Sequence, residues 1–104
     1  MGSNGNIWQS PVRPRELRRM LRMKEIRMGP IPPMPPEYTE YRQKRLRFAV
    51  DCALLFLKGK DYESIARRVG IQRSITKQNL QLYISKGAKF LVDRGVFIGL
   101  KEFD

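Results

Sequence analysis

The sequence predicts a small all-α protein: a helix-turn-helix bundle, preceded by a basic helical segment and a proline-rich linker. Three observations support this prediction. Apolar residues recur at helical spacing in several stretches, glycines follow those stretches where helices would end, and five of the seven prolines lie between residues 30 and 36. With 104 residues, the chain has room for one domain but not for two.

Residues 1–36 are expected to form a flexible basic extension of that domain. The first residues are small and polar, a composition typical of disorder. Pro14 can occupy the first position of a helix, where a missing N–H costs nothing, and good helix formers continue from residue 15 to residue 28. The prolines after Gly29 favour an extended spacer, so the domain boundary is predicted there.

Positive charge is concentrated in this extension, since residues 11–28 hold seven basic and two acidic side chains. An arginine-rich helix can bind the phosphates of DNA or RNA, and the same composition could dock on an acidic protein such as a polymerase subunit. A membrane-surface helix is the weakest interpretation, because no lipidation signal is present. The arginines expected to form this basic arm are Arg13, Arg15, Arg18, Arg19, Arg22 and Arg27.

Residues 37–104 are expected to fold as the helix-turn-helix domain. A first helix is predicted over residues 38–57, and glycine follows its end. Asp61 can then cap a short second helix over residues 62–69 with its carboxylate. A third helix is predicted over residues 74–94, with an apolar core face and a short apolar tail behind it.

The stretch G-K-D-Y-E-S-I-A-R-R-V-G-I, residues 59–71, resembles the first half of the helix-turn-helix in region four of bacterial sigma factors and in LuxR-type regulators. Asp61 stands where these families place a capping serine, and Gly70 stands at their turn. The resemblance implies a close helix crossing at Ala66 and a third helix that enters the major groove of DNA. After the turn the pattern departs from these families, because Gln72 replaces their usual serine.

The polar side of the third helix is the predicted DNA-recognition surface. It holds amides, hydroxyls and a lysine but no acidic residue, a composition suited to base edges and phosphates. Basic residues around the turn would fix the register on the DNA backbone. A merely solvated helix face is the alternative. The predicted DNA-binding residues are Arg67, Arg68, Gln72, Arg73, Ser74, Lys77, Gln78 and Gln81.

Ile75 and Leu82 lie together on the side of the third helix that faces away from its core stripe. A soluble monomer gains little by exposing them. Either the basic extension or a second copy of the protein covers them, or the first helix of the domain wraps far enough to bury them.

Composition excludes several kinds of catalytic and metal site. The chain has no histidine, so His-based catalysis and His metal ligation are ruled out. Its single cysteine, Cys52, cannot form an intrachain disulfide or a cysteine-rich zinc site. No phosphate-binding glycine motif is present, and no stretch is apolar enough to span a membrane. We therefore expect no enzyme activity, no cofactor and no metal.

The net charge of +11 favours a polyanionic partner. The sequence therefore predicts a cytoplasmic, sequence-specific double-stranded DNA-binding protein, a transcriptional regulator whose size and basicity suggest a phage origin. Alternatives are a phage small terminase or another packaging or replication factor that recognises DNA as a homo-oligomer, and a regulator that binds RNA polymerase through its similarity to sigma region four. RNA binding through the extension is a further alternative.

Overall fold

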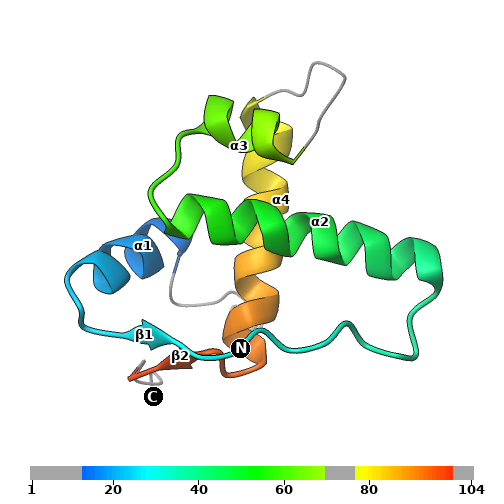
Figure 1. Ribbon diagram of the computed structural model, residues 1–104, viewed down its shortest axis with the longest axis horizontal. Coiled ribbons are helices and arrows are strands. Elements are labelled where there is room, and N and C mark those ends of the chain that lie inside the picture. Colours follow the sequence, from blue (N-terminus) through cyan, green and yellow to red (C-terminus); the bar gives the residue numbers. More distant parts are fainter. Residues whose placement is uncertain (1–12, 70–76, 100–104) are drawn as a thin grey trace, which may run out of the picture.

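The computed structural model describes residues 13–69 and 77–99, and most of these residues are helical (Figure 1). The predicted all-α class is confirmed, with a small two-stranded antiparallel sheet added to it. No helix within these ranges combines the length and apolar character of a membrane span. In chain order the elements are α1 (Pro14–Arg22), β1 (Arg27–Met28), α2 (Glu40–Leu57), α3 (Tyr62–Arg68), α4 (Lys77–Asp93) and β2 (Phe97–Ile98).

The two long helices, α2 and α4, cross at the centre of the molecule (Figure 1). Small residues make the crossing close. A Cβ added at Gly87 of α4 would overlap the backbone carbonyl of Ala49 on α2, and it would lie only 2.9 Å from Cβ of Ala53. This close approach between α2 and α4 was not predicted; the one expected at Ala66 of the short helix stays a prediction.

All six elements contribute side chains to one apolar core. Burial of a large aliphatic side chain contributes about 1.5–3 kcal/mol, so this shared cluster is the main source of stability. Leu80, Ile84 and Leu91 form the buried face of α4, as predicted. The buried members of the cluster are Leu17, Ile26, Val50, Cys52, Ala53, Phe56, Leu57, Ile65, Leu80, Ile84, Ala88, Leu91, Val96 and Phe97.

The helix predicted over residues 15–28 is shorter than expected, because α1 ends at Arg22. Lys24 then adopts a positive φ of 62°, and the chain turns into β1. The reason lies in Leu17 and Ile26, which are both buried. In a continuous helix these positions, nine residues apart at about 100° per residue, would face opposite sides. Only a turn between them lets both reach the same core.

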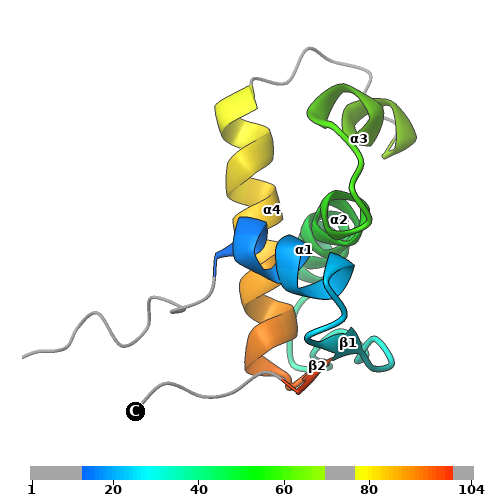
Figure 2. The ribbon, with the colours of Figure 1, turned by 90° about the vertical axis from the view of Figure 1, so that its left-hand side faces the viewer.

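Residues 14–28 therefore belong to the core and do not form an extension separate from it. Leu17 is completely buried against α2 and α4, and Figure 2 shows α1 lying in front of these helices. β1 pairs with β2 from the C-terminal tail, with Arg27 opposite Ile98. The proline run is also held in place, since Gln43 Nε2 donates a hydrogen bond of 3.0 Å to the carbonyl of buried Pro35.

The start of α3 follows the prediction, and its connection to α4 does not lie within the described residues. Oδ1 of Asp61 accepts a hydrogen bond of 2.8 Å from the backbone N–H of Ser64, which confirms the predicted cap. Gly59, just past α2, has a positive φ of 95°, as expected for the residue after a helix end. Gly70 and the predicted start of the third helix at Ser74 lie outside the described ranges.

Candidate nucleic-acid interface

One face of α1 is basic. Arg15, Arg18, Arg19 and Arg22 are spaced so that they share a side of the helix, opposite Leu17. We call these four residues the arginine stripe. They line a hollow of about 380 Å³ together with Phe56 at the end of α2, Lys60 and Asp61 before α3, and Tyr62 at the start of α3. The hollow therefore lies between α1 and the α2–α3 connection.

An aromatic pair forms the wall of this hollow. The rings of Phe56 and Tyr62 are stacked, with centroids 6.2 Å apart and planes 20° apart. Cζ of Arg18 lies 4.8 Å from the centroid of Phe56, and Nζ of Lys77 on α4 lies 5.3 Å from that of Tyr62. Cations from two different helices thus lie against the same pair of rings, at distances typical of cation–π contacts.

Tyr62 also contacts the polar face of α4. Nε2 of Gln81 donates a hydrogen bond of 3.1 Å to the hydroxyl oxygen of Tyr62. A second hollow of about 300 Å³ shares Arg15, Phe56 and Tyr62 with the first, and Gln81 and Ser85 line its far side. The arginine stripe and the polar face of α4 therefore meet at Tyr62 and form one continuous surface.

Asp61 is the only acidic residue among the described side chains that line these two hollows. Its carboxylate is engaged by the cap of α3. The hydrogen bond from the backbone N–H of Ser64 lowers its pKa, and the Ser64 side chain and the charges of Arg67 and Lys60 lower it further. Asp61 therefore stays ionised at neutral pH and stabilises the start of α3.

The acidic residue Glu25 touches the edge of the stripe. It forms an ion pair of 3.5 Å with Arg19, and both side chains are about half exposed. An ion pair of this exposure is weak, because water screens it. Breaking this ion pair would therefore cost little free energy.

The predicted site residues divide into three groups. Arg13 and the arginine stripe line the two hollows, whereas Arg27 lies on β1, at the end of the molecule away from α3 (Figure 1). The exposed side chains of the second group lie in the last turn of α3 and the first turns of α4: Arg67, Arg68, Lys77, Gln78 and Gln81. The residues that lie outside the described ranges are Gln72, Arg73 and Ser74.

The sequence did not predict that these two sets of residues would meet. The basic arm and the third helix were predicted as separate surfaces, and no role was predicted for Phe56 or Tyr62. The spacing of the arginines in residues 15–22 was a visible signal for the stripe. No local signal shows which surface the stripe faces, because this depends on how α1 packs.

Leu82 remains 61% exposed on α4, so neither α1 nor α2 covers it. The interpretation in which the first helix of the domain buries Leu82 is therefore wrong. Ile75 lies outside the described residues.

No protein-family model matches this chain, and no similar curated protein or solved structure was found. The resemblance to sigma region four and to LuxR-type regulators therefore stays a prediction from the sequence.

Proposed function

We propose that this protein binds double-stranded DNA and acts as a transcriptional regulator of the helix-turn-helix type. One observation carries the proposal: the arginine stripe and the first turns of α4 converge on the Phe56–Tyr62 stack. This places a row of positive charge beside a polar helix face that can present an amide and a lysine to DNA.

The two parts of the surface have different roles in this proposal. The stripe runs over eight residues of α1, about 10 Å, and its guanidinium groups contact phosphates of the DNA backbone. Lys77, Gln78 and Gln81 of α4 face the major groove, where glutamine amides can pair with adenine and lysine with guanine. Arg67 and Arg68, exposed at the end of α3, add phosphate contacts.

The packing of α1 strengthens the proposal. Leu17 is completely buried, so α1 is folded before DNA arrives. A charged segment that must fold on contact loses conformational entropy when it binds, whereas a stripe already held on a core does not. The arginines therefore contribute more of their electrostatic attraction to net affinity.

The salt dependence of duplex binding tests the phosphate role of the stripe. A double variant, Arg18→Gln with Arg22→Gln, removes two of its charges. Loss of two phosphate contacts should reduce the slope of log affinity against log salt by about 1.8. Fluorescence anisotropy with a labelled DNA duplex measures this slope.

A matched control removes the same charge elsewhere. Arg27 and Lys58 are exposed and lie apart from the stripe, around a different hollow. Their double substitution by glutamine should leave the salt slope close to that of the unchanged protein. An equal reduction in both double variants would mean that only total charge matters, and the proposed interface would be wrong.

Selection of bound fragments from random duplex DNA tests sequence recognition. A shared motif among the fragments would support the regulator, and its symmetry would show whether a dimer binds. A ring-like assembly on sizing would instead favour the terminase or packaging role. Co-purification of RNA polymerase without duplex binding would favour the polymerase-binding role.

A further inference from the structure

A second group of basic and aromatic side chains lies along the N-terminal half of α2, beside its crossing with α4. Tyr38, Tyr41 and Tyr83 line a groove of about 280 Å³, which we call the tyrosine groove. This volume is close to the lower end of the range found for small-molecule sites, about 300–1,000 Å³. The remaining residues that line it are Arg42, Arg45, Leu46, Ala49 and Lys86.

The three tyrosines of the groove differ in how far their rings are open to a ligand. Tyr41 is 67% exposed, so a ligand can reach its ring, whereas Tyr38 and Tyr83 are partly buried. Cζ of Arg45 lies 5.7 Å from the centroid of the Tyr41 ring. Tyr83 is held at the other wall by an edge-to-face contact with Phe48, with centroids 4.8 Å apart and planes at 87°.

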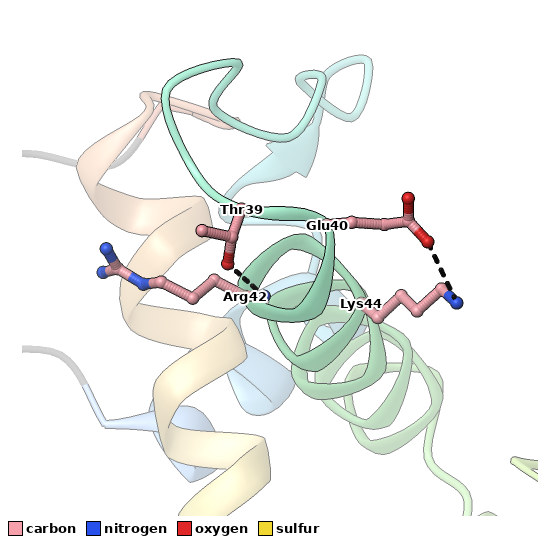
Figure 3. A network of polar contacts seen from close by, with 4 residues as sticks. All are labelled: Thr39, Glu40, Arg42 and Lys44. Carbon is pink, nitrogen blue, oxygen red and sulfur yellow. Dashed lines mark hydrogen bonds and ion pairs between the residues drawn. The ribbon is translucent and has the colours of Figure 1, made fainter.

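The groove is positively charged. Arg42, Arg45 and Lys86 line it, and none of the described lining residues is acidic. Cζ of Arg42 lies 3.9 Å from the ring centroid of Tyr38, so this ring positions its guanidinium group. Two acidic residues adjoin the groove's tyrosines in sequence, Glu37 and Glu40, and neither lines the groove. Glu40 pairs with Lys44 at 3.5 Å, and Figure 3 shows this pair on the opposite side of α2 from the Arg42 side chain.

The exposed ring of Tyr41, beside two arginines and a lysine, matches the chemistry of an unpaired nucleic-acid strand. Bases stack on the rings, while the cations follow the phosphates. A duplex cannot use the rings in this way, because its bases are stacked on each other. We propose that the tyrosine groove binds single-stranded DNA, with at least one base stacked on Tyr41 and phosphates held by Arg42, Arg45 and Lys86.

This inference goes beyond the proposed duplex binding and does not depend on it. Figure 1 shows α1, which carries the arginine stripe, beside the C-terminal end of α2. The tyrosine groove is lined instead by residues of the N-terminal half of α2. The two surfaces share no lining residue. They can therefore be tested separately.

The test measures binding of a labelled short thymidine oligonucleotide to the full chain by fluorescence anisotropy, with excess unlabelled duplex present to occupy the arginine stripe. The Tyr41→Ala variant should bind the oligonucleotide about 5- to 150-fold more weakly, the range expected for loss of one stacked base. Tyr41→Phe is the matched control and should bind like the unchanged protein, because stacking needs the ring and not the hydroxyl.

An abasic oligonucleotide of the same length separates stacking from charge. The unchanged protein should bind it about as weakly as Tyr41→Ala binds the thymidine strand, and Tyr41→Ala should weaken its binding no further. Because Tyr41 is mostly exposed, its variants should keep the circular dichroism spectrum and melting temperature of the unchanged protein.

Two results would overturn the proposal: equal binding of the thymidine strand by Tyr41→Ala and the unchanged protein, or equal binding of abasic and thymidine strands. Tighter binding of a uridine oligonucleotide would identify RNA as the ligand and make the DNA assignment wrong. Failure of duplex binding alone would refute the role of the arginine stripe and leave the result for the tyrosine groove intact.

Discussion

Replacement of Gly87 by alanine should destabilise the protein, although alanine is the better helix former. Gly87 lies where α4 crosses α2, and an added Cβ would overlap the carbonyl group of Ala49. It would also lie 2.9 Å from Cβ of Ala53, a distance that real Cβ atoms do not adopt. The obstacle is backbone and not the end of a flexible side chain, so the two helices must move apart.

The expected magnitude is the difference between two opposing effects. In a free helix, alanine in place of glycine stabilises by about 1 kcal/mol. Forcing an extra carbon into a well-packed crossing costs about 1–3 kcal/mol, and a backbone obstacle places this site in the upper part of that range. The free energy of unfolding should therefore fall by about 1–2 kcal/mol, which corresponds to a melting temperature lower by about 4–16 °C.

Thermal unfolding followed by circular dichroism measures this change, and two further variants make the result specific. Ser85→Ala, at an exposed position of the same helix, should change the free energy of unfolding by no more than about 0.5 kcal/mol. Adding Ala49→Gly to Gly87→Ala should not restore stability, because the overlap is with the carbonyl group and not with the Ala49 methyl. A melting temperature of Gly87→Ala at or above that of the unchanged protein would refute the close crossing.

Two further predictions concern Cys52 and Leu82. Cys52 is completely buried, and burial, with a smaller effect of the Asp51 charge, raises its pKa from 9.0 to about 11. Mass spectrometry should therefore find the folded protein unlabelled by iodoacetamide at pH 8 and labelled after denaturation, and rapid labelling of the folded protein would contradict the burial. The free energy of unfolding should fall as pH rises from about 9 to 11, because only the unfolded thiol ionises in that range. Leu82→Ser should leave the melting temperature almost unchanged, because this side chain is exposed in the single chain. If a second copy covers Leu82 in a dimer, the variant should also have a lower mass by light scattering. A clear loss of stability at unchanged mass would exclude this dimer.

Local signals in the sequence predicted the middle of the fold well. The cap at Asp61, the glycine after α2 and the buried face of α4 depend on residues within a few positions of one another, and the structure confirms all three. The end of α1 depends instead on Ile26 reaching the same core as Leu17, and on β1 pairing with β2 about seventy residues later. No local pattern encodes either contact, so the predicted helix was too long.

The charged and polar members of the candidate site were predictable, whereas its aromatic pair and its arrangement were not. The arginines of the stripe and the polar residues of α4 were all named from charge and spacing. What joins them is Tyr62, which touches Lys77 and Gln81 of α4 and stacks on Phe56. Such a bridge between helices appears only after tertiary packing, because each contact crosses from one element to another.

The packing of α1 fixes where its positive charge lies on the molecule. A stretch with seven basic and two acidic residues predicts a solvated tail when it is considered alone. In the fold, α1 uses Leu17 to join the core and presents its arginines on the opposite face. One short helix therefore both stabilises the core and holds a row of arginines at the surface. Because its arginines are fixed relative to Tyr62 and α4, the proposed DNA contact should depend on their spacing and not only on their number.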